Sequence, residues 1–281
     1  MNAELLLMCT LDCDRAYLHA HSERELTGDE QSRYNATLSE RARGVPAQYI
    51  TGHQEFWGLD LIVSPAVLIP RPETEHVVET VLELVKGKRV GGQECPPRTN
   101  SAHTNSTATT SVDAIRLADV GTGSGCIALA LAKELPGAEI HATDISLPAL
   151  EIARANAARH GLADRVQFHE ADLLEGLQSD FDFVVSNPPY VGESEADQVQ
   201  TEVRKFEPRN AVFAGATGTE VIARLIPQAW VALRPGGWLV LEISGTIAGE
   251  VMRLLDGWEG VSTLPDLQGI LRVVRAQKPA E

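Results

Sequence analysis

Four consecutive residues, Asn187-Pro188-Pro189-Tyr190, suit chemistry on a planar nitrogen. The side chain of Asn187 offers one carbonyl acceptor and one NH2 donor. The two prolines have a fixed φ and no N–H, so the carbonyl of Pro188 can turn toward a ligand as a second acceptor. Tyr190 adds a flat face on which an amide or a base can stack. The segment predicts a site that grips a planar amino or amide group, and an ordinary Pro-Pro loop is the alternative.

The tetrapeptide follows an apolar run, Phe181–Ser186, that is typical of a buried strand in a parallel sheet. Residues that follow such a strand lie at the carboxyl edge of the sheet, where open α/β folds bind ligands. A second apolar strand, Leu117–Val120, leads into a glycine-rich turn and then into an apolar helix, Cys126–Lys133. In this arrangement backbone N–H groups at the helix start face a ligand. The turn consists of Gly121, Thr122, Gly123, Ser124 and Gly125.

The glycine spacing differs from that of a dinucleotide site. The third glycine comes one residue early, and Cys126 occupies the position where a dinucleotide turn has glycine. This spacing suits a ligand without a pyrophosphate. Asp144 follows the next expected strand, residues 138–142, about 20 residues after the glycines, where a carboxylate can bind both hydroxyls of a ribose. Alternatively, Asp144 only precedes the helix expected over 147–160, with Ser146 as its N-cap. A third strand, 165–169, leads to Asp172, which can meet an adenine amino group.

Glycine turn, acidic residue and Asn-Pro-Pro-Tyr, in this order, resemble class I S-adenosylmethionine-dependent methyltransferases, in the branch that methylates planar nitrogens. Further segments closely resemble the release factor glutamine methyltransferases (HemK/PrmC family). Before the glycine turn these are Ile69–Glu75, Tyr49–Gly52 and Glu55–Gly58. After the tetrapeptide they are Phe206–Phe213, Leu233–Ile243 and Asp266–Gly269 with Arg272.

This resemblance implies an α/β fold with a doubly wound, mostly parallel, seven-stranded Rossmann-like sheet, a small N-terminal helical domain and a β-hairpin connector. It implies S-adenosyl-L-methionine as cofactor. The cofactor-binding residues would be Gly121, Thr122, Gly123, Ser124, Gly125, Asp144, Asp172, Leu173 and Asn187. The substrate-binding residues would be Asn187, Pro188, Pro189 and Tyr190, with Arg71 and Glu73, and the catalytic ones Asn187, Pro188 and Tyr190. Arg71 and Glu73 either line a cleft between domains or simply begin the following helix.

The implied reaction is methylation of the side-chain amide nitrogen of the glutamine in the Gly-Gly-Gln motif of peptide chain release factors. Asn187 Oδ1 and the Pro188 carbonyl would accept the two amide N–H bonds and hold the nitrogen in line with the methyl group. An alternative is methylation of an adenine or guanine exocyclic amine in RNA or DNA, with the same grip on an extruded base. A cofactor-binding scaffold without catalysis is a third interpretation.

Charge and composition favour a protein substrate. The chain of 281 residues has a formal net charge of -15 and a pI near 5.0, whereas proteins that grip a phosphate backbone are usually basic. We therefore expect no stable nucleic-acid binding. Four cysteines without a paired spacing indicate a reduced protein without a metal site, and no leader or membrane-spanning stretch is evident. We expect a cytoplasmic monomer.

The pattern divides the chain into three parts. Residues 1–47 read as an N-terminal helical domain that docks the substrate. Residues 48–73 form a β-rich connector with a hairpin turn at Trp57-Gly58. Residues 74–281 form the methyltransferase domain, and within it 90–113 has the composition of a disordered surface loop.

Overall fold

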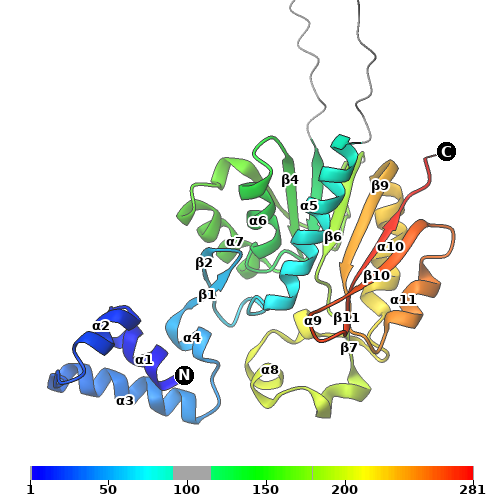
Figure 1. Cartoon of the computed structure of the whole chain (residues 1–281). Coiled ribbons are helices and arrows are strands. Elements are labelled where there is room, and N and C mark those ends of the chain that lie inside the picture. The colour runs from blue at the N-terminus through cyan, green and yellow to red at the C-terminus, as the bar shows by residue number, and fades with distance from the viewer. Residues whose placement is uncertain (1, 91–114, 179, 281) are drawn as a thin grey trace, which may run out of the picture.

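The computed structural model describes residues 2–90, 115–178 and 180–280. Its centre is a seven-stranded sheet of order β10-β11-β9-β6-β3-β4-β5 (Figure 1). The parallel strands are β3 (Arg116–Val120), β4 (Glu139–Asp144), β5 (Val166–Glu170), β6 (Phe181–Ser186) and β9 (Leu233–Glu242). Strand β11 (Leu271–Gln277) is antiparallel to both β9 and the edge strand β10 (Glu259–Pro265). The mostly parallel seven-stranded sheet is confirmed.

Helices cover both faces of the sheet because apolar residues of the central strands alternate in direction. One face is covered by α5 (Glu75–Val90), α6 (Cys126–Glu134) and α7 (Leu147–Arg159), and the other by α10 (Glu220–Ala232) and α11 (Ala248–Leu254). Leu117 and Phe183 pack toward α5, α6 and α7, whereas Ala118 and Val184 pack toward α10 and α11. The sheet is therefore doubly wound, as expected.

The order of strands reverses next to β3. The chain moves outward from β3 through β4 to β5, and then returns to place β6 on the opposite side of β3. Ligands bind to open α/β sheets at such a switch point, outside the carboxyl ends of the strands. The residues after β3 and β6, which are the glycine turn and the Asn-Pro-Pro-Tyr segment, meet at this point.

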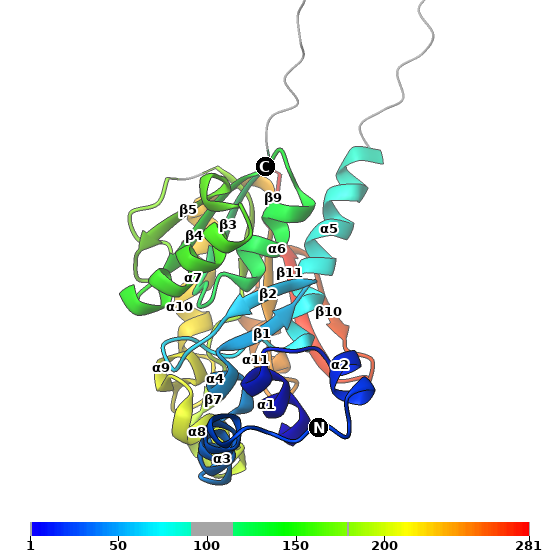
Figure 2. The same ribbon diagram turned by 90° about the vertical axis from the view of Figure 1, so that its left-hand side faces the viewer.

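The N-terminal helices lie to one side of the sheet (Figures 1 and 2). They are α1 (Asn2–Leu11), α2 (Arg15–Ala20), α3 (Gly28–Ala42) and α4 (Ala47–Thr51). Thr27 and Glu30 form a reciprocal capping box at the start of α3. The expectation of a β-rich connector from residue 48 onward is wrong for its first residues, because α4 continues until Gly52 ends it at φ 77.

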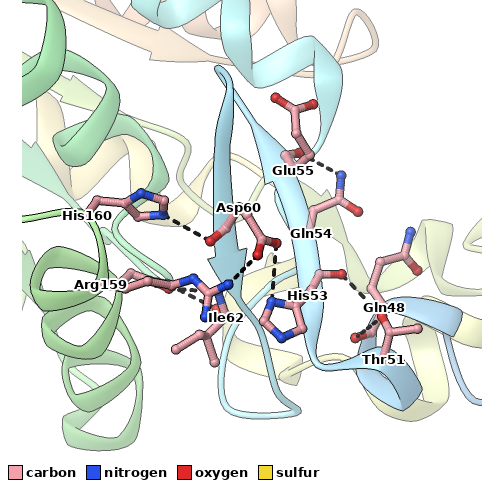
Figure 3. Close-up of polar contacts among 10 residues, drawn as sticks. Gln48, Thr51, His53, Gln54, Glu55, Asp60, Ile62, Arg159 and His160 are labelled. Atoms are coloured by element: carbon pink, nitrogen blue, oxygen red, sulfur yellow. Dashed lines mark hydrogen bonds and ion pairs between the residues drawn. The ribbon is translucent and has the colours of Figure 1, made fainter. Parts of the chain in front are cut away.

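The connector hairpin pairs β1 (His53–Phe56) with β2 (Leu59–Ile62). Its two turn residues, Trp57 and Gly58, both have positive φ, 53 and 67, as the tightest hairpin turns require. The hairpin docks on α7, where Asp60 accepts from Arg159 at 2.5 Å (Figure 3). The hairpin thus ties the N-terminal helices to the catalytic domain.

Several short elements follow the Asn-Pro-Pro-Tyr segment and were not predicted. Strand β7 (Val191–Gly192) pairs with β8 (Phe213–Gly215), and between them lie η3 (Glu193–Gln198), α8 (Thr201–Phe206) and α9 (Arg209–Val212). Two further 3-10 turns are η1 (Pro72–Thr74) and η2 (Ala163–Arg165). In the described part of the chain, no helix is long and apolar enough to cross a membrane. The predicted loop 90–113 lies outside the described residues except for Val90, the last residue of α5.

Candidate active site

A first cavity, of about 320 Å³, opens at the carboxyl ends of β3, β4 and β6. Its lining brings together most of the residues expected to bind a cofactor, namely Gly121, Thr122, Gly123, Ser124, Asp144, Asp172, Leu173 and Asn187. Gly125 lies outside this lining. It has φ 84 at the start of α6, and a Cβ added there would lie 3.3 Å from the Cβ of Ala153. Its small size serves the packing of α6 on α7.

The glycine turn presents bare backbone to the first cavity. Gly121 and Gly123 have φ values of 69 and 56, which L side chains rarely adopt, and a Cβ on either would point into open space. Two N–H groups of the turn donate to β4: Thr122 donates to the carbonyl of Thr143 at 2.8 Å, and Gly123 donates to Asp144 Oδ2 at 2.9 Å. The turn is therefore fixed to β4 before any ligand arrives.

Asp144 is held in place by backbone donors. Its Oδ2 accepts from Gly123 and its Oδ1 from the N–H of Ser146, each at 2.9 Å. Burial raises the pKa of this carboxyl. Ser146 is the N-cap of α7 and accepts from Ala149, so the capping interpretation holds for Ser146 while Asp144 itself lines the cavity. A carboxylate has further lone pairs with which Asp144 can bind ligand hydroxyls.

Asp172 and Leu173 also line the first cavity. Asp172 Oδ2 accepts from Arg224 at 2.6 Å, and Arg224 also lines the cavity. Leu173 has φ 58, a left-handed conformation that is uncommon for a residue with a branched side chain. Arg224, which reaches this place from α10, was not identified from the sequence.

A fully buried carboxyl lies beneath the glycine turn. Asp119, at the end of β3, is 0% exposed, and its Oδ2 accepts from Thr122 Oγ1 at 2.7 Å and from the N–H of Ala128 at 3.1 Å. Burial raises the pKa of Asp119 to about 7. Asp119 was not identified from the sequence, although an acidic residue in an otherwise apolar strand is the signal that could have identified it.

The Asn-Pro-Pro-Tyr segment stands between two cavities. Asn187 and Pro189 line the first, and Tyr190 lines a second cavity of about 450 Å³. Pro188 is buried and belongs to neither lining. The walls of the second cavity come from the N-terminal helices, the connector and the catalytic domain, and they consist of Pro46, Gln48, Ile69, Arg71, Glu73, Tyr190, Gln200, Glu202, Val203, Glu207, Glu242 and Arg272.

Arg71 and Glu73 occupy the wall of the second cavity and also lead into α5. Arg71 precedes the turn η1, which contains Glu73 and leads into α5. The two residues therefore line a cleft and also lie at the start of the following helix, which were the two expectations for them. The Nη2 of Arg71 pairs with Glu207 Oε1 at 2.5 Å, and Glu207 Oε2 accepts from the N–H of Ile69 at 3.3 Å. The side chain of Glu207 is 2% exposed, so this ion pair fixes the segment Ile69–Glu75 to the catalytic domain.

A hydrogen-bonded network joins the two cavities. Asn187 Nδ2 donates to Thr74 Oγ1 at 3.0 Å, and Thr74 Oγ1 donates to Glu242 Oε2 at 2.6 Å. Tyr190 Oη donates to Glu242 Oε1 at 3.0 Å. Burial raises the pKa of Glu242, which is 1% exposed. Thr74 and Glu242 were not identified from the sequence, although a carboxyl that ends the apolar strand β9 was a visible signal.

Fold and site together define a class I, Rossmann-like methyltransferase: a glycine turn, carboxylates and an Asn-Pro-Pro-Tyr segment meet at the switch point of a mostly parallel sheet. Family models agree. A "Methyltransferase small domain" model matches residues 106–205, and a "PrmC N-terminal domain" model matches residues 1–52.

The chain belongs to the release factor glutamine methyltransferase family. It is 52% identical to the release factor glutamine methyltransferase of Koribacter versatilis (strain Ellin345), with 99% of this chain and 91% of that protein covered. It is 41% identical to the corresponding protein of Xylella fastidiosa (strain 9a5c), with 99% and 93% covered. The family resemblance of the sequence motifs is thereby confirmed.

Solved structures of low sequence identity share the fold. The hMettl16 catalytic domain in complex with a 3'UTR hairpin superposes with a TM-score of 0.59 at 17% identity, over 84% of this chain and 80% of that one. A 16S rRNA N2 methyltransferase (RsmC) of T. thermophilus, in complex with AdoMet and guanosine, has a TM-score of 0.54 at 19% identity, over 80% and 49%. At this identity the likeness establishes the Rossmann-like methyltransferase fold and nothing finer.

Proposed function

We propose that this protein transfers a methyl group from S-adenosyl-L-methionine to the side-chain amide nitrogen of the glutamine in the Gly-Gly-Gln motif of peptide chain release factors. The observation that carries the proposal is the hydrogen bonding of the Asn187 side chain. Its Nδ2 is engaged by Thr74, which leaves Oδ1 to accept a hydrogen bond from a substrate N–H at the first cavity, which Asn187 lines.

The lining of the first cavity fits the cofactor by its chemistry. Bare glycine backbone at Gly121 and Gly123 admits a ligand closely, and the carboxylates suit hydroxyl groups and a positively charged ligand. In this assignment Asp144 binds the ribose hydroxyls, while Asp172 and Leu173 hold the adenine. When bound, the cofactor supplies a methyl group activated by an adjacent positively charged sulfur.

The protein's own contribution is to position a weak nucleophile. An amide nitrogen reacts slowly because its lone pair is delocalised into the carbonyl. Asn187 Oδ1 and the carbonyl of Pro188 accept the two N–H bonds of the substrate amide and stabilise the positive charge that develops on nitrogen. Holding the nitrogen in one place also removes most of the entropic barrier to the encounter. The proton leaves to water after transfer.

Tyr190 provides the surface on which the substrate amide packs. Its hydroxyl is bound to Glu242, and both the burial of the phenol and the nearby carboxylate raise its pKa, so the ring stays neutral and fixed. The second cavity, which Tyr190 lines, is the entrance for the glutamine side chain in this proposal. Arg71 and Glu73 on its wall contact the substrate loop.

Charge and domain arrangement support a protein partner. The net charge of -15 opposes a nucleic-acid backbone, and the names of the relatives specify release factors. The residue before α4, Pro46, and Gln48 within α4 both line the second cavity, so a docked release factor would reach the active site along the N-terminal helices. We expect the enzyme to act in the cytoplasm as a monomer.

Substitution of Asn187 tests this assignment. We expect Asn187→Ala to abolish methyl transfer to a purified release factor, because the substrate amide loses the side-chain acceptor that holds it. Cofactor affinity, measured by isothermal titration calorimetry, should stay close to that of the wild type. A parallel loss of cofactor affinity would contradict the role given to Asn187.

A further inference from the structure

Two buried polar residues behind the Asn-Pro-Pro-Tyr segment contact neither cofactor nor substrate in the assignment above. Thr74, in the turn η1, and Glu242, at the end of β9, are each 1% exposed and lie 168 positions apart in the chain. A carboxyl group is kept in such a place only with hydrogen-bonding partners, since its desolvation is unfavourable. The hydroxyls of Thr74 and Tyr190 are these partners.

The network has a direction that the chemistry of its groups fixes. Thr74 donates its single hydroxyl proton to Glu242 Oε2 at 2.6 Å, so the carboxyl oxygen is the acceptor at the end of the network. The oxygen of Thr74 can then only accept, and the group facing it must be the NH2 of Asn187. The opposite amide orientation would place Oδ1 against the Thr74 oxygen with no proton between them.

We propose that Thr74 and Glu242 are positioning residues, which form a one-way hydrogen-bond relay that holds the Asn187 amide with Oδ1 toward the substrate. The inference rests on the proposed function, because that orientation matters only if Asn187 accepts from a substrate N–H. With the Asn187 amide reversed, its NH2 would face the substrate N–H, and the hydrogen bond between Asn187 and the substrate would be lost. The same carboxylate also fixes Tyr190, so one buried group orders two side chains of the segment.

Isosteric variants separate the relay from packing. Thr74→Val keeps the shape but removes the hydroxyl, Thr74→Ser keeps the hydroxyl, and Glu242→Gln supplies an amide that can donate to Thr74 and reverse the relay. We expect Thr74→Val and Glu242→Gln each to lower kcat on a release factor roughly 10- to 100-fold, the range of one misplaced charged or buried hydrogen bond. The Kd for S-adenosylmethionine should change less than about threefold, which corresponds to about 0.6 kcal/mol. Thr74→Ser should recover most of the lost turnover.

A second buried threonine provides the matched control. Thr80, in α5, is 3% exposed and donates to the carbonyl of His76 at 2.7 Å, so Thr80→Val removes a buried hydroxyl away from the relay. We expect this variant to keep the wild-type kcat. The double variant Thr74→Val with Glu242→Gln should be no slower than either single variant, because both break the same relay.

A readout that does not depend on turnover separates the relay from the proposed function. In protein labelled with ¹⁵N-asparagine, the Asn187 side-chain amide signal can be assigned by its loss in Asn187→Ala. We expect Thr74→Val to move this signal and to speed its hydrogen exchange, and Thr80→Val to leave it unchanged. An unmoved signal, or a Thr74→Val kcat equal to that of Thr80→Val, would overturn the relay. A moved signal in an enzyme that methylates no release factor would overturn the proposed function alone.

Discussion

The buried carboxyl of Asp119 makes a quantitative prediction about stability and pH. Its ordinary pKa is 3.8, and burial raises the pKa in the folded protein to about 7. The folded state therefore holds this proton more tightly than the unfolded chain. The resulting stabilisation is fully present below about pH 3.8 and is lost as the pH rises through about 7.

The size of the effect follows from the two pKa values of Asp119. A difference of about three pKa units corresponds to about 4 kcal/mol of unfolding free energy. All of this stabilisation is lost at pH 8, whereas only about 2 kcal/mol of it is lost at pH 5. Asparagine at this position does not titrate. The stability of Asp119→Asn relative to the wild type should therefore increase by about 2 to 3 kcal/mol between pH 5 and pH 8.

Urea unfolding of both proteins without cofactor at pH 5, 6, 7 and 8 measures this change. Any constant cost of the substitution cancels, because only the difference between pH values is compared. Asp197→Asn is the control, since that side chain is fully exposed (101%) and its removal should alter stability by less than about 1 kcal/mol at every pH. A stability difference between Asp119→Asn and the wild type that is equal at pH 5 and pH 8 would refute the reasoning.

Two further pairs of variants test the packing around the site, each by urea unfolding. Arg71→Ala removes the ion-pair partner of the buried Glu207 carboxylate and should lower the unfolding free energy by about 3 kcal/mol. Arg41→Ala removes the partner of Glu202, which is 39% exposed, and should lower the unfolding free energy by less than about 1 kcal/mol. Equal losses in the two variants would contradict the role of burial. Gly218 has φ 90, and Gly218→Ala puts a Cβ 2.6 Å from the carbonyl oxygen of Tyr190. This variant should lower the unfolding free energy by about 2 kcal/mol or more and slow methyl transfer. Gly249→Ala, in open space on α11, should raise the unfolding free energy by about 0.5 kcal/mol. A Gly218→Ala protein with wild-type stability and turnover would show that the segment tolerates this displacement.

The central strands could be predicted from the sequence because they are buried on both faces and read as continuous apolar runs. The strand Phe181–Ser186 has the bounds that the pattern indicated. Strand β10 and the short elements between β7 and β8 were missed, because they are polar or very short and take their structure from tertiary contacts.

The candidate site was predictable where its residues follow strands directly. The glycine turn, Asp144 and Asn187 each come after a strand, and parallel strands bring their carboxyl ends to one edge. The contacts of Thr74 with Glu242 could not be inferred, since nothing local relates two residues 168 positions apart. Family motifs contain both residues, but a motif does not say which atoms meet.

The most direct test of the account is transfer of labelled methyl from S-adenosylmethionine to a purified release factor, beside a copy in which the glutamine of its Gly-Gly-Gln motif is replaced. We predict label on the intact factor alone, which would identify the substrate, the residue and the reaction together. Label on neither protein, with tRNA, rRNA or DNA labelled instead, would contradict the account.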